Sequence, residues 1–242
     1  MSLNLTLPSE HDASDLRVFL ERAAKLGCEH VRLIGVGPVL AAYVGVLVPS
    51  GLLDTAPTVL GLRVFERSED AQTASASGET PNTTGANSSG MRAELGRFLP
   101  LDTVVTIRGM LDRLARPELT FALPVGEAGI AWAGVSAPRS GWEAVGVLSA
   151  VDLEAIARAG IDEIAGSNGL GTIIVTRARR EVWGRPIFSG VSTEEQVAGA
   201  KLVSGAAFAA FGLGFLGEDQ PQLSRSANWT RLTTARGHIL VR

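Results

Sequence analysis

Apolar residues recur at intervals of three and four positions in four stretches of the chain, which predicts four amphipathic helices. The first helix has its apolar face on Leu16, Phe19, Leu20, Ala23 and Leu26. Either Asp12 or Ser14 is expected to cap its start, and Gly27 supplies a left-handed stop. Since such an apolar face needs a surface to cover, the helix is predicted to pack on a sheet.

The other three helical patterns differ in how clearly they begin. Two of them follow a capping box, Ser149 with Asp152 and Ser192 with Glu195, so helices are predicted to start there. The remaining stretch, 102–115, is predicted to be a helix, although "TVVTI" within it is β-branched enough to form a strand.

Strand patterns occur after the first helix and again near the end of the chain. Three β-rich pieces, "EHVRLI", "VLAAYVGVLV" and "TVLGLRVFER", are joined by short turns and predict an antiparallel meander. Later, "GTIIVTRARREVWGRPIF" alternates like a hairpin with one exposed face, and "NWTRLTTARGHILVR" predicts a second hairpin. Short strands are expected at "LTFALP" and "GIAWAGV". The predicted fold class is α+β: antiparallel sheets, made of the meander and two later hairpins, packed by four to five helices.

One stretch interrupts this pattern. Residues 68–90, "SEDAQTASASGETPNTTGANSSG", contain no large apolar side chain in a chain that is 45% hydrophobic overall. Ordering them would cost more conformational entropy than their burial returns, so a flexible low-complexity loop is expected. We therefore expect a helix-plus-meander subdomain over 1–67, this loop, and an α+β subdomain over 91–242 that folds cooperatively with the first.

Composition narrows the function classes only in part. A net charge of −3 and a pI near 5.7 create no general attraction to nucleic acid or to an anionic membrane. The single cysteine, Cys28, excludes an intramolecular disulfide, and no signal peptide is recognisable, so a cytoplasmic location is expected. Residues 33–53 are uncharged, but Pro38 and Pro49 divide them into strand-sized pieces, so no membrane segment is expected.

The sequence carries no catalytic or cofactor signature. "GLGFLG" at 212–217 has the letters of a dinucleotide-binding loop, but it follows a predicted helix, whose dipole is negative at that end. His11, His30 and His238 are the only histidines, and no nucleophile motif accompanies them. No metal-binding spacing occurs. We therefore expect no catalytic residue, no metal and no cofactor.

Arginine and tryptophan supply the candidate ligand-binding residues. Arginines are dense in the first late hairpin, and residues 224–242 contain four arginines, one histidine and no acid. If both hairpins lie in one sheet, they form a basic strip beside two tryptophans that could bind a phosphate-bearing ligand or nucleic acid. A solvated face that protects a sheet edge is the alternative, and it is favoured. The candidates are Arg177, Arg179, Trp183, Arg185, Trp229 and Arg231.

A resemblance to a known group rests on Trp132, on "APRSGW" ending at Trp142, on the helix through Arg158 and Gly160, and on "WTRLTTARGHILVR". In these segments the chain resembles a group of uncharacterised actinobacterial proteins of similar length. The resemblance covers most of the chain outside residues 68–90. It implies no site residues, because the group has no assigned activity.

Three functions remain open on these observations. The first is a non-catalytic binding or scaffolding protein that forms homo-oligomers, because aliphatic surface and late tryptophans suit contacts between proteins. The second is a small-ligand binder or enzyme that holds a small anionic ligand in an arginine-lined pocket between the subdomains. The third is a weak nucleic-acid binder through the basic strip, which the overall charge disfavours.

Overall fold

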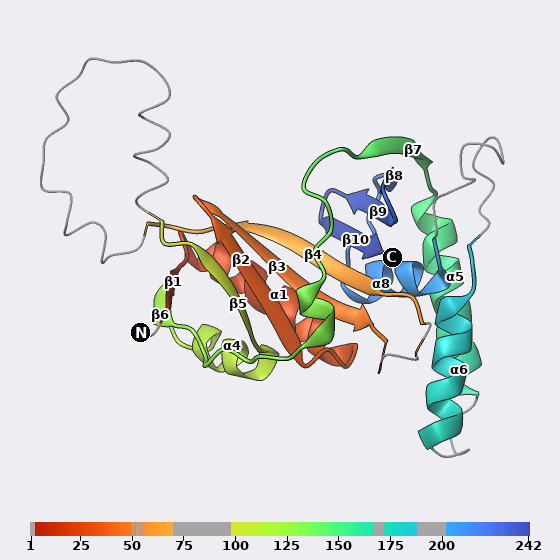
Figure 1. Cartoon of the computed structure of the whole chain (residues 1–242), viewed down its shortest axis with the longest axis horizontal. Helices are drawn as coiled ribbons and strands as arrows, with labels where there is room; N and C mark the ends of the chain where they lie inside the picture. The colour runs from red at the N-terminus through yellow and green to blue at the C-terminus, as the bar shows by residue number, and fades with distance from the viewer. Residues whose placement is uncertain are drawn as a thin grey trace, which may run out of the picture. The chain divides into compact units, whose positions relative to one another are not determined.

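The computed structural model describes residues 3–49, 51, 54, 56–69, 98–166, 172–187 and 202–242. They form two compact units (Figure 1). Unit 1 comprises Met1–Tyr43 and Val64–Ile130, and unit 2 comprises Val44–Arg63 and Ala131–Arg242. Strands β3 (Val39–Leu47) and β4 (Val59–Glu66) contribute residues to both units.

Unit 1 is a sheet in the order β5-β2-β3-β4 with two helices and a separate pair of short strands. Its remaining elements are β1 (Asn4–Thr6), α1 (Glu10–Lys25), β2 (His30–Val36), β5 (Leu101–Thr106), α4 (Ile107–Leu114) and β6 (Thr120–Ala122). β5 pairs antiparallel with β2, and β6 pairs antiparallel with β1. The predicted meander is thus confirmed as β2, β3 and β4, and the short strand in "LTFALP" is confirmed as β6.

Helix α1 covers one face of this sheet, as its apolar pattern predicts (Figure 1). Leu16, Phe19 and Leu20 are completely buried, and the Phe19 ring lies 6.1 Å from the Phe65 ring of β4, centroid to centroid. The cap is one turn earlier than expected, because the Ser9 hydroxyl accepts a hydrogen bond from the Asp12 backbone N–H. Gly27 adopts φ +87° after the helix, as predicted.

The prediction of one helix over 102–115 is wrong for its first half. Residues Leu101–Thr106 form β5, and only Ile107–Leu114 are helical. The β-branched run supplies a strand that pairs along β2, and the Thr106 side chain then caps α4 by accepting a bond from the Gly109 N–H.

Unit 2 pairs its strands antiparallel in the order β4-β10-β9-β8-β7 and packs helices against one another and against β10. Its elements are η1 (Ala131–Gly134), β7 (Glu143–Val147), α5 (Ala150–Ala165), α6 (Thr172–Gly184), α8 (Ser204–Gly212), β8 (Gln222–Ser226), β9 (Trp229–Thr234) and β10 (Gly237–Val241). The hairpin predicted at the end of the chain is confirmed as β9 and β10. The strand expected at "GIAWAGV" is wrong, since residues 131–134 form a 3₁₀ turn.

The hairpin predicted over 171–188 is also wrong, because Thr172–Gly184 form helix α6. From Arg177 to Val182 the segment is mostly Arg, Ala and Glu, which are good helix formers. Trp183 of this helix is also buried within unit 2, and the alternating pattern of a strand does not predict that burial. The cap of α5 by Ser149 is confirmed, and the predicted capping box at Ser192 and Glu195 lies outside the described residues.

The fold class is α+β, with antiparallel sheets packed by helices, as predicted. "GLGFLG" begins at the last residue of α8, and Gly214 within it adopts φ +71°, so these glycines end a helix instead of opening one. Of the 68–90 tract, only Ser68 and Glu69 are described. No helix in the described segments is long and apolar enough to cross a membrane.

Candidate functional site

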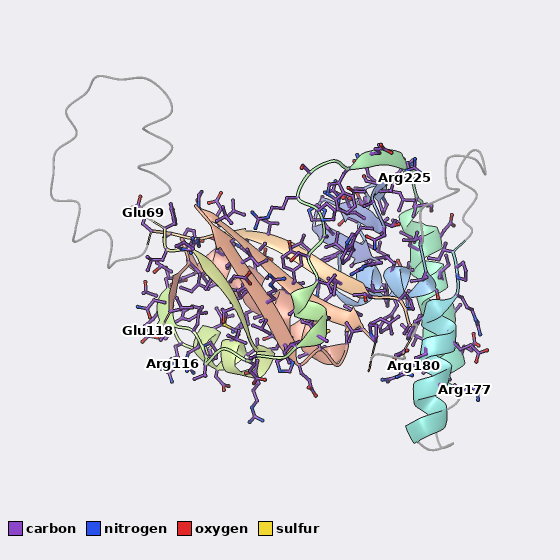
Figure 2. The ribbon with its side chains drawn as sticks, in the orientation of Figure 1. Glu69, Arg116, Glu118, Arg177, Arg180 and Arg225 are labelled. Atoms are coloured by element: carbon purple, nitrogen blue, oxygen red, sulfur yellow. The ribbon has the colours of Figure 1, made fainter. Side chains whose placement is uncertain are left out.

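One face of α6 forms the wall of a pocket of about 650 Å³ in unit 2. Positions 177, 180, 181 and 184 follow the i, i+3, i+4, i+7 spacing that places side chains along one side of a helix. The pocket is lined by Arg177, Arg180, Glu181, Gly184 and Arg185, and by Asp54, Ala56 and Pro57 from the segment between β3 and β4. We call this site the α6 pocket; Figure 2 marks Arg177 and Arg180 on the helix.

Asp54 fixes Arg180 at the edge of the pocket. The Arg180 Nη2 lies 3.0 Å from Asp54 Oδ2, and the Asp54 side chain is only 9% exposed. The second carboxylate oxygen accepts a 3.0 Å hydrogen bond from the Ala56 N–H. Because Asp54 is held by its own backbone turn, it presents a fixed partner that limits the rotamers available to Arg180.

Glu163 of α5 fixes Arg185 in the same way. Two parallel hydrogen bonds of 2.7 Å join the Arg185 Nη1 and Nη2 to the two Glu163 oxygens. These bonds lower the pKa of Glu163 and raise the pKa of Arg185, so both groups stay charged. A bidentate arginine–carboxylate pair has a defined geometry, which orients the guanidinium of Arg185 beside the pocket.

Arg177 differs from the other two arginines. Its side chain is exposed, and none of the described residues forms an ion pair or hydrogen bond with it. Three carboxylates, Asp54 and Glu181 of the lining and Glu163 beside it, accompany the three arginines, but none of them bonds to Arg177. Arg177 is therefore the guanidinium that is available to an incoming anion.

The opposite side of α6 anchors the helix. The Trp183 indole stacks on the Phe208 ring of α8 with 4.3 Å between centroids and 19° between planes. Gly160 of α5 leaves the room for that indole, since a Cβ there would lie 2.6 Å from Trp183 Cη2. The Ser204 hydroxyl also donates to the Val182 carbonyl. Packing on this side holds the arginine face in place.

The structure brings together only two of the six candidate residues predicted from sequence, Arg177 and Arg185, at the α6 pocket. Arg179 is exposed on α6 outside the pocket lining, and Trp183 is buried in the helix packing. Trp229 and Arg231 lie on β9, where Trp229 is buried. The continuous basic strip is wrong, because it required residues 171–188 to form a hairpin.

A second pocket, of about 690 Å³, lies in unit 1 beside Cys28, His30 and α4. Burial raises the pKa of the Cys28 thiol to about 12, so the thiol stays protonated and unreactive at neutral pH. The His30 Nε2 is bonded to Glu127 Oε2 at 3.0 Å. Among the described residues, no group of three histidine, cysteine or carboxylate side chains is arranged to hold a metal ion.

These features define an α+β protein made of two compact parts, with an arginine-lined pocket in the second. The chain belongs to the family described as domain of unknown function DUF8010, whose model matches residues 1–134. Residues 137–242 match a further domain of unknown function, DUF8185. No curated protein and no solved structure is similar enough to count as a match. The expected relation to proteins without an assigned activity is thereby confirmed.

Proposed function

We propose that this protein is a non-catalytic binding protein that holds a small polyanion, bearing phosphate or carboxylate groups, in the α6 pocket. The observation that carries the proposal is that three arginines line one pocket while Arg177 has no acidic partner among the described residues. Guanidinium groups bind oxyanions through two parallel N–H donors, which gives both energy and orientation.

The two paired arginines support the proposal because they are already ordered. Asp54 holds Arg180 in place, and Arg185 keeps an Nε–H donor that Glu163 does not use. A ligand would therefore have to order only Arg177, at a cost of about 0.5–1.5 kcal/mol. One charge-assisted hydrogen bond contributes about 1.5–3 kcal/mol. With three arginines partly neutralised by neighbouring acids, we expect a dissociation constant of roughly 10 µM to 1 mM.

The absence of an activated nucleophile among the described residues supports binding over catalysis. Cys28 is buried with a pKa near 12, His11 is exposed on α1, and His30 is engaged by Glu127. The one cysteine in the sequence, Cys28, is buried and forms no disulfide, which supports placing the protein in the cytoplasm as part of the proposal.

A thermal-shift experiment tests the proposed function. Pyrophosphate and citrate are added to the full chain, with sodium chloride at equal ionic strength as the control. At a hundredfold excess over the dissociation constant, binding stabilises the folded state by about 2.7 kcal/mol. For a chain of this size the melting temperature then rises by roughly 5–10 °C.

Two variants locate the effect on α6. Arg177→Gln is expected to remove about half of the shift, since tenfold weaker binding leaves about 1.4 kcal/mol of stabilisation at the same ligand concentration. Arg179→Gln removes the same charge from the same helix and is expected to preserve the shift. Stabilisation by neither anion, or an equal loss in both variants, contradicts the proposal. Stabilisation by only one of the two anions identifies the ligand chemistry.

A further inference from the structure

Arg231 of β9 is held in an unusual environment on the sheet of unit 2. Its guanidinium carbon lies 4.3 Å from the ring centroid of Trp142. The Trp142 Nε1–H donates a 2.9 Å hydrogen bond to the Pro138 carbonyl, which fixes the indole. A cation over a fixed aromatic face has little rotational freedom, so the guanidinium is preorganised.

One donor of this guanidinium has no acceptor. The Nε of Arg231 is the one buried side-chain nitrogen or oxygen, among those of the described residues, that makes no hydrogen bond. A buried N–H without a partner costs about 1–3 kcal/mol, and native structures rarely leave one unsatisfied. Burial also lowers the pKa of Arg231. The acceptor for this N–H is a water or an anion, and the positive charge of the guanidinium favours an anion.

The strand register shows which side chains share this face. Arg231 is directly opposite Ser224 of β8 and Leu240 of β10, and His238 is its diagonal neighbour on β10. Strands β8, β9 and β10 carry no acid, and Glu143 of the adjoining strand β7 is opposite Arg225 and bonds to it at 3.3 Å. Because side chains alternate along a strand, Arg225 and Glu143 lie on the other face from Ser224 and Arg231.

His238 adds a second polar group to the same face. Its Nδ1 lies 3.1 Å from the Thr233 hydroxyl, and its pKa is lowered by burial and then by the charge of Arg231. Arg231, Trp142 and His238 are all partly exposed, whereas the Arg231 Nε itself is buried, so a solute reaches the guanidinium from solvent but must displace a neighbouring side chain to reach the Nε.

We propose that this face of the β8, β9 and β10 strands is a second anion site, with Arg231 as its central donor and a phosphate group as its ligand. Guanidinium, serine hydroxyl and imidazole groups stand on one face of three neighbouring strands, so the face carries three separate polar groups. A tetrahedral oxyanion offers oxygens in several directions, whereas a planar carboxylate matches a single fork. The site is independent of the α6 pocket.

Nuclear magnetic resonance of the arginine side chains tests this site directly. The full chain is labelled with ¹⁵N-arginine and titrated with sodium phosphate at constant ionic strength. The Nε–H signal of Arg231, assigned from its loss in Arg231→Lys, is expected to move downfield and to saturate as the proton gains an acceptor. The Nε–H signal of Arg225, which already faces Glu143, is expected to stay in place.

Controls separate this result from general charge effects. Arg231→Lys keeps the positive charge but lacks the planar fork, so we expect phosphate affinity at least about tenfold weaker. Arg225→Gln removes a charge from the neighbouring strand and is expected to bind phosphate normally. No shift of the Arg231 signal, or a shift of all arginine signals that follows ionic strength, would overturn the proposal. An equal, saturable shift with acetate would overturn the assignment to phosphate.

Discussion

Replacing Gly160 by alanine probes the packing that positions the arginine face. A Cβ at Gly160 would press on the Trp183 indole, with Cη2 at 2.6 Å, and would lie 3.1 Å from Val182 Cγ1. The indole cannot retreat freely, because its other face is stacked on Phe208 at 4.3 Å. Alanine gains about 1 kcal/mol of helix propensity over glycine inside α5. Overpacking costs about 1–3 kcal/mol, and loosening the ring pair about 0.5–1.5 kcal/mol.

The balance predicts that Gly160→Ala lowers the free energy of unfolding by about 0.5–3.5 kcal/mol. Urea unfolding followed by circular dichroism measures it, and the melting temperature should fall by about 2–4 °C per kcal/mol. Gly184→Ala, at the last residue of α6, is the matched control, since a Cβ there meets nothing within 4 Å. Should Gly160→Ala prove as stable as Gly184→Ala, the close contact between α5 and α6 would be wrong.

Three further predictions concern single features. The pKa of His238 is lowered in the folded state, so its contribution to stability is complete above pH 6.5 and is lost as pH falls through the folded-state pKa. Urea unfolding of His238→Gln should therefore lose less stability between neutral and acidic pH than the unaltered chain, and equal slopes would count against this effect. Cys28, with a pKa near 12, should react with a thiol reagent at neutral pH only after denaturant is added, and rapid reaction in buffer would contradict its burial. Replacing residues 71–89 by a short Gly-Ser turn should leave the melting temperature nearly unchanged, because closure entropy grows slowly with loop length; a loss of several degrees would show that the tract contributes to the fold.

Much of the fold could be predicted where local pattern and tertiary contacts agree. The apolar face of α1, the meander, the Ser149 cap and the final hairpin each have a pattern that matches their burial in the structure. Residues 171–188 show the opposite case. Their alternation favours a hairpin, but α6 forms because Trp183 packs against Gly160 and Phe208, which lie far away in sequence. A sequence pattern within residues 171–188 cannot show these contacts, because their partners lie outside the segment.

The candidate site could be predicted only through its arginines. Their density marked Arg177 and Arg185, but the acids that hold the pocket, Asp54 and Glu163, come from other parts of the chain. Asp54 lies in a loop and accepts a hydrogen bond from the N–H of Ala56, two residues later. Such side-chain turns are common for aspartate, so the sequence does not indicate that Asp54 pairs with Arg180. Trp183 was expected to border a ligand, but it is buried on the side of α6 that faces away from the pocket.

Calorimetric titration of the full chain with pyrophosphate tests the binding function most directly. Arg177→Gln and Arg179→Gln carry the same change of charge on the same helix, and only Arg177 lines the α6 pocket. We predict saturable binding that Arg177→Gln weakens by about tenfold, equivalent to 1.4 kcal/mol, and that Arg179→Gln leaves within about twofold. Heat signals that do not saturate, or equal weakening in the two variants, would contradict a ligand site at α6.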